Sequence, residues 1–467
     1  MIPVSLQWVA KQVNGKLVGS DTIINAVTTD TRSLRANDLF IALTGPNFDG
    51  HEFIQKAIDT SAAALIVSKP VSTSIPHILV GDTRTALGQL AAAVKREVAP
   101  RTVAITGSSG KTTVKEMVAS ILLRRGNVLA TAGNFNNDIG VPLTLLRLEH
   151  QHEFAVVELG ANHLGEIAYT VDLVKPDTAT IVNAAASHLE GFGSIFGVAR
   201  AKSEIFKGLD ASGVAIINYD SQFHDYWHGK IKRNKVITFS QNGDAGSDFY
   251  AKDVSLGLDG CAAFEMVTSQ GSIGVVLNIP GVHNIGNALV AAALSLSVGA
   301  SLEDVREGLA TIAQVKGRLN VKQLSNQIRL LDDTYNANVA SVKAGIDLLE
   351  SFSGHRILVL GDMAELGEKA RYYHQEVGEY AKHKGIDNVY SLGVLSQHAS
   401  QVFQVQGSHF SNIQSLIEKL TLDLQFEQRD ITILVKGSRS AKMERVVTAI
   451  EASPVGKFER RRERIAC

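Results

Sequence analysis

Thr106-Gly-Ser-Ser-Gly-Lys-Thr-Thr113 is the stretch that decides the fold of this 467-residue chain. The apolar run Val103-Ala-Ile105 precedes it and predicts a buried strand. In residues 112–125, which follow it, apolar side chains recur at i, i+3, i+4, i+7 and i+8, which predicts an amphipathic helix. A strand, a small-residue turn and a helix in this order are the setting that a phosphate-binding loop requires. The sequence therefore predicts that a nucleotide phosphate binds at residues 106–113.

The residue types in this loop suit phosphate chemistry. Glycines and serines let backbone N–H groups wrap a phosphate, and the start of the helix adds partial positive charge. Lys111 can reach the β- and γ-phosphates, and the hydroxyl of Thr112 can ligate Mg²⁺, a hard cation that prefers oxygen. Ile105 stands where the general G-x-x-x-x-G-K-[ST] pattern has its first glycine, so an ordinary turn before a helix is the alternative. The loop alone does not name a reaction.

Short apolar runs alternate with helix-period segments along almost the whole chain. This alternation predicts parallel sheets covered by helices, the α/β class. The chain separates into residues 1–80, a central block over 81–313 and a third block over 314–467 with its own βα alternation. We therefore expect three α/β domains: a small N-terminal one, a central P-loop domain with a mostly parallel sheet, and a Rossmann-like C-terminal one.

Composition and charge exclude several classes of protein. Lys and Arg total 46 against 47 for Asp and Glu, so a strongly basic nucleic-acid binder is not expected. Cys261 and Cys467 are too few for a disulfide scaffold or a four-cysteine zinc site. The stretch 288–298 is far short of the roughly 20 apolar residues that span a bilayer, and the first residues lack the pattern of a signal peptide. We expect a cytoplasmic protein with no membrane span and no nucleic-acid partner.

Three more polar residues follow apolar strands, as ligand-binding residues do in parallel sheets. Glu158 could complete a Mg²⁺ shell with Thr112, or it could cap a helix. His188 could bind a ligand, although a lone histidine is more often structural. Lys202 lies in a helical segment, where lysines are ordinarily exposed.

Together these segments resemble the Mur ligase family, the ATP-dependent enzymes that form amide bonds in peptidoglycan synthesis. The loop T-G-x-x-G-K-T-T is the family's shortened version, so Ile105 fits it. Matching motifs run through all three blocks in order: Asp30-Thr-Arg32, Asp38-Leu-Phe-Ile-Ala-Leu43, Asp49-Gly-His51, Gly133-Asn-Phe-Asn-Asn-Asp-Ile-Gly-Val-Pro142, His188-Leu-Glu-Gly-Phe-Gly-Ser194, Asp332-Asp-Thr-Tyr-Asn-Ala-Asn338, Gly361-Asp-Met-Ala-Glu-Leu-Gly367 and Val435-Lys-Gly-Ser-Arg-Ser-Ala-Lys-Met-Glu444. The last three resemble the family member that adds D-alanyl-D-alanine. Thr334 and Val339 depart from that pattern, where Ser and Pro are expected.

The resemblance implies roles for particular residues. ATP would be bound by Gly107, Ser108, Ser109, Gly110, Lys111, Thr112, Thr113, Asn284, Asn287, Arg318 and Asp333. Two Mg²⁺ ions would be held by Thr112, Glu158, His188 and Lys202, the last as a carbamate. The N-terminal domain would bind a uridine nucleotide through Asp30, Thr31, Arg32, Asp49 and His51. The incoming dipeptide would meet Asn134, Asn136, Asn137, Tyr335, Asn336, Asn338, Ser438 and Arg439. The residues implied in catalysis are Lys111, Lys202, His188 and Arg318.

Each softer assignment also has a structural interpretation. The segment 30–32 could be a helix cap with a surface ion pair, the three asparagines could be turn formers, and Tyr335 could be a core-edge residue. The complete ordered set favours the ligase interpretation.

The implied reaction joins D-alanyl-D-alanine to UDP-N-acetylmuramoyl-tripeptide through an acyl phosphate made from ATP. It is the last cytoplasmic step in making the peptidoglycan precursor, and we expect a monomer. His188 and a phosphate oxygen are both candidates for the general base, and the third residue of the tripeptide could be diaminopimelate or lysine. The alternatives are a sibling ligase that adds the third amino acid, a folyl-polyglutamate type ligase, and a P-loop nucleotide switch or scaffold. The sibling ligases should lack the motifs 332–338 and 436–443, and a switch would need neither a uridine-nucleotide domain nor a carbamate lysine.

Overall fold

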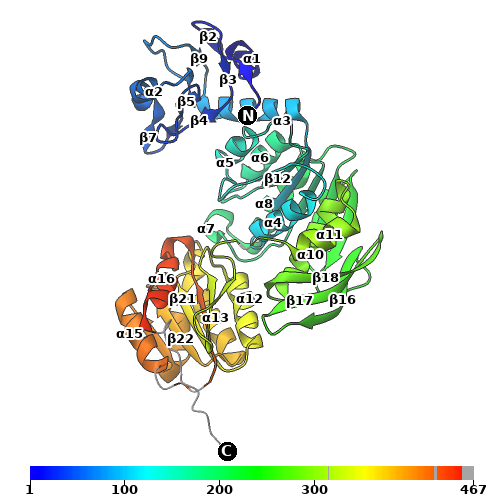
Figure 1. Cartoon of the computed structure of the whole chain (residues 1–467), viewed down its shortest axis with the longest axis vertical. Helices are drawn as coiled ribbons and strands as arrows, with labels where there is room; N and C mark the ends of the chain where they lie inside the picture. The colour runs from blue at the N-terminus through cyan, green and yellow to red at the C-terminus, as the bar shows by residue number, and fades with distance from the viewer. Residues whose placement is uncertain (314, 425–426, 428, 455–467) are drawn as a thin grey trace, which may run out of the picture.

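Three α/β units follow one another along an arc in the computed structural model (Figure 1). The structure describes residues 1–313, 315–424, 427 and 429–454. Within these ranges each unit is built on one larger sheet, and most strand pairs in those sheets are parallel. The expected α/β class with three units is therefore confirmed. The exact domain boundaries stay predictions, and residue 314 lies outside the described residues.

The N-terminal unit is built on a five-stranded sheet in the order β2-β9-β8-β5-β4. Only β2 runs antiparallel to its neighbour. Its strands are β2 (Lys16–Val18), β4 (Val27–Thr28), β5 (Leu39–Ile41), β8 (Ala64–Val67) and β9 (His77–Leu79); its helices are α1 (Leu6–Gln12) and α2 (Ile54–Asp59); its short pairs are β1 (Val4–Ser5) with β3 (Ile23–Ile24) and β6 (Thr44–Gly45) with β7 (Phe48–Asp49). Apolar residues of α1 share one core with helix α3 (Thr83–Val98), so this unit is packed against the central one.

The central unit is built on a nine-stranded sheet in the order β11-β12-β10-β13-β14-β15-β16-β17-β18. Its strands are β10 (Arg101–Thr106), β11 (Val128–Ala130), β12 (Phe154–Glu158), β13 (Thr178–Ile181), β14 (Val214–Asn218), β15 (Lys235–Ser240), β16 (Phe249–Leu256), β17 (Cys261–Thr268) and β18 (Gly271–Pro280). Besides α3, its helices are α4 (Lys111–Leu122), α5 (Gly140–Leu145), α6 (Glu166–Val174), α7 (Leu189–Phe192), α8 (Ile195–Lys202), α9 (His224–Lys230), α10 (His283–Ser297) and α11 (Leu302–Ala310). The pairs from β11 to β16 are parallel, and β16, β17 and β18 form antiparallel hairpins.

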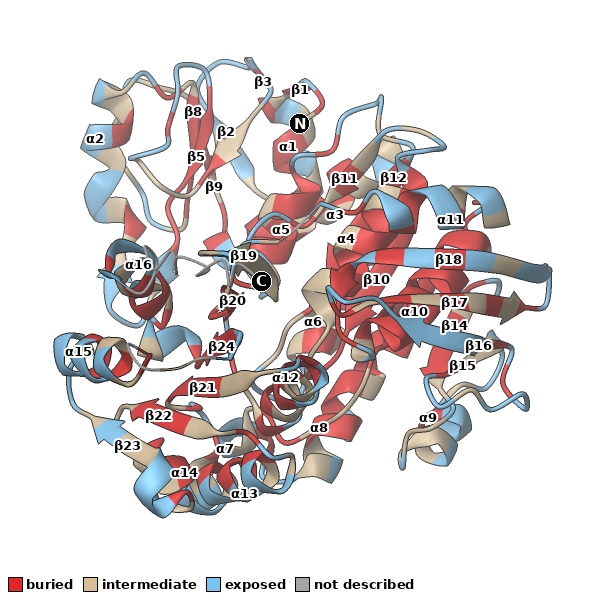
Figure 2. Cartoon of the chain, turned by 60° about the horizontal axis from the view of Figure 1, so that its bottom comes forward, coloured by how far each residue is buried: buried red, intermediate tan, exposed pale blue. Residues whose placement is uncertain are grey.

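Strand β10 positions the phosphate loop. It lies between β12 and β13, where the strand order changes direction, and such a switch point is where ligands bind in open α/β sheets. Helix α4 follows the loop and packs its apolar face against α10 and α11. Figure 2 shows the buried residues concentrated along β10, α4 and α10. A fully packed strand and helix thus hold the two ends of residues 106–111.

The C-terminal unit has a six-stranded sheet in the order β19-β20-β24-β21-β22-β23. Only β19 is antiparallel to its neighbour. Its strands are β19 (Asn320–Gln323), β20 (Ile328–Asp333), β21 (His355–Gly361), β22 (Asn388–Leu392), β23 (Gly407–Phe410) and β24 (Ile431–Lys436), and its helices are α12 (Val339–Ser351), α13 (Ala370–His383), α14 (Gln397–Gln401), α15 (Ile413–Leu424) and α16 (Glu444–Ala452). Residues that follow β20 and β24 line a cavity together with the phosphate loop of the central unit, and Glu365, which follows β21, contacts His188.

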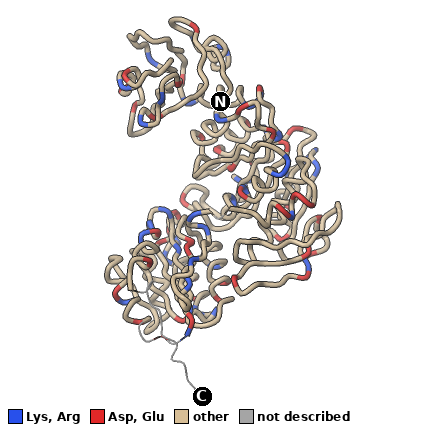
Figure 3. Tube along the Cα trace, viewed as in Figure 1, with Lys and Arg blue, Asp and Glu red and all other residues tan. Residues whose placement is uncertain are grey.

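Charged side chains of both signs are spread over all three units (Figure 3). Among the described residues, no helix combines the length and the apolar character that a membrane crossing needs.

Candidate active site

The phosphate loop is shaped by a left-handed glycine and by an asparagine from the neighbouring strand. Gly110 has φ +78°, and a Cβ there would lie 2.7 Å from Oδ1 of Asn287. The side-chain oxygen of Asn183, just after β13, accepts hydrogen bonds from the N–H groups of Ser108 at 3.1 Å and Ser109 at 3.0 Å. Only glycine fits the position before the helix without strain. Asn183 therefore fixes the backbone of the loop and takes up the N–H groups of Ser108 and Ser109.

Lys111, the first residue of α4, is folded back over the loop. Its Nζ donates to the carbonyl oxygen of Gly107 at 2.7 Å. Burial lowers the pKa of Lys111, the Glu158 carboxylate opposes that shift, and the Arg318 guanidinium adds to it. The Lys111 ammonium is thus held by a backbone carbonyl oxygen, from which it can turn to a phosphate.

Thr112 and Glu158 meet at one side of the cavity, as predicted for a metal shell. The Thr112 hydroxyl donates to Oε2 of Glu158 at 3.0 Å, and the Asn136 amide donates to Oε1 at 2.8 Å. Glu158 is buried at the end of β12, so it does not cap a helix. Two adjacent hard oxygens are a donor set that fits Mg²⁺. Within the described ranges no three His, Cys, Asp or Glu side chains gather into a metal-holding group.

Lys202 is not the surface lysine that its helical position suggests. It ends α8 with only 2% of its surface exposed, and it lines the same cavity as Lys111 and His188. Burial, and then the positive charge of Lys111, hold the pKa of Lys202 well below its ordinary value. Its amine is therefore far more often neutral than that of an exposed lysine.

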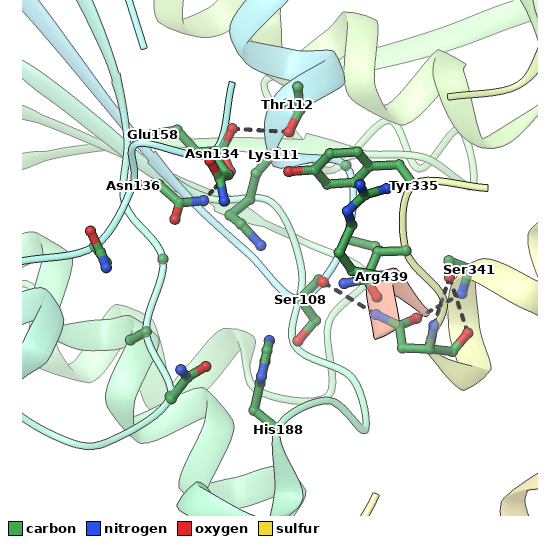
Figure 4. A pocket seen from close by; sticks show the side chains of 18 of the residues that line it. Ser108, Lys111, Thr112, Asn134, Asn136, Glu158, His188, Tyr335, Ser341 and Arg439 are labelled. Carbon is green, nitrogen blue, oxygen red and sulfur yellow. Dashed lines mark hydrogen bonds between the residues drawn. The ribbon is translucent and has the colours of Figure 1, made fainter. Parts of the chain in front are cut away.

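His188, the residue just before α7, points into the cavity, toward the space that the Lys111 side chain enters (Figure 4). Burial is the main cause of its lowered pKa, which the nearby Glu365 carboxylate opposes and the charges of Lys111 and Lys202 reinforce. Its Nδ1 is in ion-pair contact with Glu365 of the C-terminal unit. The purely structural interpretation of His188 is thus not favoured.

The C-terminal unit closes over the phosphate loop through two side chains. Arg318 donates to the Thr112 hydroxyl at 3.4 Å, and its guanidinium lies 4.2 Å from the centre of the Tyr335 ring. Asn338 caps α12 through its bond from the N–H of Ser341, and its amide donates to the carbonyl oxygen of Ser108 at 3.2 Å. The capping box with Ser341 holds Asn338 although Val339 follows it. Tyr335 is half-buried in the cavity wall and is not a core-edge residue.

The cavity beside the phosphate loop has a volume of about 260 Å³ and lies between the central and C-terminal units. It brings together predicted residues from both: Ser108, Ser109, Gly110, Lys111, Thr112, Asn134, Asn136, Asn137, Glu158, His188, Lys202, Arg318, Tyr335, Asn336, Asn338 and Arg439. Ser438 does not line it; that residue is buried, and its N–H donates to the carbonyl oxygen of Asp362 at 2.9 Å. Asn137 also accepts from the N–H of Gly140 at 2.8 Å across the turn before α5, so its turn-forming interpretation holds as well.

A second cavity of about 80 Å³ shares Ser109, Gly110 and Arg318 with the first. Its other predicted residues are Thr113, Asn284, Asn287 and Asp333. The Asn287 amide donates to Oδ1 of Asn284 at 2.8 Å, which fixes both side chains on α10. This cavity therefore continues from the phosphate loop toward the residues that the resemblance assigns to adenosine.

The five predicted uridine-nucleotide residues lie apart from both cavities, in the N-terminal unit. Asp30 and Arg32 form an exposed ion pair at 2.6 Å, which lowers the pKa of Asp30 to about 2, and Thr31 lies between them. The Asp49 carboxylate lies 2.6 Å from Nδ1 of His51. The surface ion pair expected from the structural interpretation is thus present, and a role for these five residues in nucleotide binding stays a prediction.

Sequence reasoning missed several residues of the site, among them Asn183 beside the phosphate loop and the cavity residues Lys436 and Ser341. Asn183 lies two residues after β13, and Glu158 is the last residue of β12, so position at the end of an apolar strand was a signal that could have found Asn183. Lys436 is buried in ion-pair contact with Asp333 and donates to the carbonyl oxygen of Asn336 at 3.0 Å. Ser341 lines both cavities from α12. Lys436 stands inside a motif that the resemblance used, yet only the fold shows that it meets Asp333.

Comparison with known proteins gives the same family over nearly the whole chain. Three family models match: "Mur ligase family, catalytic domain" over residues 23–95, "Mur ligase middle domain" over 105–295, and "Mur ligase, glutamate ligase domain" over 317–439. The UDP-N-acetylmuramoyl-tripeptide–D-alanyl-D-alanine ligase of Escherichia coli K12 is 52% identical, over 97% of this chain and 99% of its own.

Solved structures agree with this match. A crystal structure of MurF from Acinetobacter baumannii is 36% identical with a TM-score of 0.92, covering 97% of this chain and 99% of its own. The MurF ligase of Thermotoga maritima in complex with ADP is 27% identical with a TM-score of 0.83, covering 93% and 99%. With a relative more than half identical and three consecutive family models along its length, this chain belongs to the Mur ligase family.

Proposed function

We propose that this chain is the ATP-dependent ligase that joins D-alanyl-D-alanine to UDP-N-acetylmuramoyl-tripeptide. The observation that carries the proposal is the meeting of the phosphate loop with residues 335–338 and Arg439 in one cavity. A loop that binds ATP in one unit thus faces the motifs that resemble the D-alanyl-D-alanine-adding member in the other. The E. coli relative with that name supports the same substrate pair.

The chemistry follows from the weakness of a carboxylate as an electrophile. The terminal carboxylate of the tripeptide attacks the γ-phosphorus of ATP, the bond to the β-phosphate oxygen breaks, and ADP leaves. The amine of D-alanyl-D-alanine then attacks the acyl carbon, phosphate departs, and the amine loses a proton. Lys111 and Arg318 would neutralise the charge on the transferring phosphoryl group, and positioning would supply much of the rate.

We propose that Thr112, Glu158, His188 and a carbamate on Lys202 hold Mg²⁺. The bond between Thr112 and Glu158 and the burial of Lys202 support this set. A bound Mg²⁺ supplies charge neutralisation for phosphate oxygens. A neutral buried amine can capture CO₂, and the product is an anion with two oxygens, which the neighbouring charge of Lys111 would favour.

The N-terminal unit would hold the uridine nucleotide through Asp30, Thr31, Arg32, Asp49 and His51, since the chain's phosphate loop lies elsewhere. A substrate with its nucleotide in that unit must reach the cavity with its peptide end. The cytoplasmic location and the monomeric state stay predictions.

A coupled assay of ADP release tests the proposal. ADP should form only when UDP-N-acetylmuramoyl-tripeptide and D-alanyl-D-alanine are both present. Release with a single amino acid in place of the dipeptide would identify a sibling ligase, and release with folate substrates a folyl-polyglutamate type. ATP hydrolysis that neither substrate changes would favour a nucleotide switch. Tripeptides ending in diaminopimelate and in lysine, tried in parallel, would identify the third residue.

A further inference from the structure

Lys436 contacts one residue of each of the two cavities. It is the last residue of β24, and only 2% of its surface is exposed. Its ammonium is in ion-pair contact with Asp333, which lines the second cavity. The same ammonium donates to the carbonyl oxygen of Asn336, which lines the cavity beside the phosphate loop, at 3.0 Å. One buried cation thus connects the side of the site assigned to adenosine with the side assigned to the dipeptide.

The C-terminal sheet and α12 fix the position of this lysine. Strands β20 and β24 are parallel neighbours, and Lys436 lies opposite Asp333 at their carboxyl ends. Residues opposite one another in paired strands have their side chains on the same face of the sheet. A Cβ at Gly345 of α12 would lie 3.0 Å from Cδ2 of Leu434 and 3.8 Å from Cδ of Lys436, so this helix lies close over the lysine stem. The ammonium is therefore directed by packed elements on both sides.

Residues 334–338 form the loop between β20 and α12, and Lys436 holds its middle. The N–H of Tyr335 donates to the carbonyl oxygen of Gly317 at 3.1 Å, and Asn338 caps α12 at the other end of the loop. Asn336 lies between these two anchors, and its carbonyl oxygen accepts from Lys436. The direction of the Asn336 backbone thus depends on the lysine.

We infer that Lys436 is a positioning residue that serves both the nucleotide site and the dipeptide site. Its contact with Asp333 fixes the carboxylate that the resemblance assigns to ATP, and its bond to Asn336 fixes the loop assigned to D-alanyl-D-alanine. The inference rests on the proposed function, because it names one residue that positions the groups for two substrates of that reaction.

Three variants separate the two contacts of Lys436. Lys436→Met keeps the length of the buried stem and removes both contacts, whereas Asp333→Ala removes only the carboxylate. Because Lys436→Met leaves a buried carboxylate without its cation, the double variant Lys436→Met/Asp333→Ala provides a form without an unpaired buried charge. Lys343→Met is the matched control, since Lys343 donates to Glu376 at 2.6 Å in the same unit and neither residue lines the two cavities.

Calorimetry of the full-length protein with ADP and Mg²⁺ measures the nucleotide half of the inference. Loss of one hydrogen bond weakens binding roughly 10-fold. We expect the Kd for ADP to rise by about this factor in Lys436→Met and in Asp333→Ala. If Lys436 acts on the nucleotide through Asp333, the double variant should bind ADP as Asp333→Ala does, because the residue that is positioned is already gone.

Steady-state ADP release measures the dipeptide half. The KM for D-alanyl-D-alanine should rise roughly 10-fold in Lys436→Met and in the double variant, by the same loss of one bond. It should stay at the wild-type value in Asp333→Ala, which keeps the bond to Asn336, and in Lys343→Met. The KM for the UDP substrate should stay unchanged in all four variants, and kcat at saturating substrates should fall less than the KM for the dipeptide rises.

A KM for the dipeptide in Lys436→Met equal to that in Lys343→Met would overturn the inference, and so would an equal rise in the KM for the UDP substrate. A double variant that binds ADP more weakly than Asp333→Ala would show that Lys436 does not act through Asp333. A wild type that binds ADP but releases none from ATP with both substrates would refute the proposed function and the dipeptide half of the inference with it. The calorimetry would still decide the nucleotide half.

Discussion

Lys202 shows what burial does to a single side chain. Its pKa is lowered by burial and by the charge of Lys111, so the folded pKa lies below the unfolded one. Between these two pKa values the unfolded chain binds more protons than the folded chain. The unmodified lysine therefore costs stability at neutral pH, and this cost decreases as the pH rises toward about 10.4. A carbamate would remove that cost, because an anion beside Lys111 is attracted where an ammonium is repelled.

Lys202→Ala should be almost inactive, and short carboxylic acids should restore part of its rate by occupying the place of the carbamate. Lys202→Arg should not be restored, because a guanidinium stays protonated. ADP release measured against formate and acetate concentration checks this. The wild type without acid is the reference, and full activity of Lys202→Ala in the absence of any acid would refute the carbamate.

Lys111→Ala should lose turnover while the protein stays folded. The side chain hydrogen-bonds to the carbonyl oxygen of Gly107 and is not part of the apolar core, so its removal should leave the packed strand β10 and helix α4 intact. Loss of one charge-stabilising group costs roughly 10²- to 10³-fold in rate in comparable sites. ADP release and a melting curve measure the two effects. Lys207→Ala, at an exposed position, is the control, and near-wild-type turnover of Lys111→Ala would show that the phosphate site is misassigned.

At the scale of elements, Asn338 has two structural roles at the start of α12. It caps the helix, and it reaches across to Ser108. Asn338→Ala should lower the free energy of unfolding by about 1 kcal/mol, the usual effect of losing a cap. Asn338→Ser should keep the cap and lose only the long reach. We expect near-normal stability but reduced turnover for the serine variant, measured by urea unfolding and ADP release; equal turnover of serine and wild type would argue against the interunit contact.

His374 of α13 makes the loop 361–367 sensitive to acid. Its Nε2 accepts a hydrogen bond from the N–H of Met363, and its Nδ1 lies 2.7 Å from the carbonyl oxygen of Ala370. The neutral ring makes both contacts, whereas a second proton, on Nε2, would remove the acceptor for Met363. Burial lowers the pKa of His374 below its ordinary 6.5. The contribution of neutral His374 to the free energy of unfolding is therefore complete above pH 6.5. It is lost as the pH falls from 6.5 through the lowered pKa of the folded state. His374→Gln should lose stability at pH 7 but less further stability between pH 7 and 5 than the wild type; parallel slopes in urea unfolding would contradict this.

The elements also show how far sequence reasoning reached. Strand β10 and helix α4 were predictable because, over residues 103–122, the apolar run, the small turn residues and the helical repeat of apolar side chains all indicate a strand, a turn and a helix. The antiparallel hairpins β16–β18 were not predicted, since pairing direction depends on partners elsewhere in the chain. The meeting of Lys436 with Asp333, and of Glu365 with His188, joins residues about 100 and more positions apart. Lys436 and Asp333 meet because β24 pairs with β20 in one sheet, whereas Glu365 and His188 meet because two units of the molecule contact one another.

At the scale of the whole molecule, the arrangement of units separates the predicted substrate sites. The cavity lies between the central and C-terminal units, whereas residues 30–51 lie in the N-terminal unit at the other end of the arc (Figure 1). One substrate must span this separation for its carboxylate to meet ATP. Arg318 and Asn338 already reach the phosphate loop from the C-terminal unit, through hydrogen bonds of 3.4 Å to Thr112 and 3.2 Å to Ser108. We expect bound ATP to shorten these two contacts.

Binding of an ATP analogue with the UDP substrate should therefore compact the molecule. A compact chain of this length has a radius of gyration of roughly 23 Å, and three units along an open arc should exceed that value until the substrate joins them. Small-angle scattering of the wild type should give a smaller radius with both ligands than without them, because domain closure excludes water and brings Arg318 to the γ-phosphate. Arg318→Ala should bind the UDP substrate yet compact less, since it lacks the side chain that links ATP to the C-terminal unit. An unchanged radius in an enzyme that turns over at full rate would mean that these contacts, already formed without ligand, suffice for the reaction.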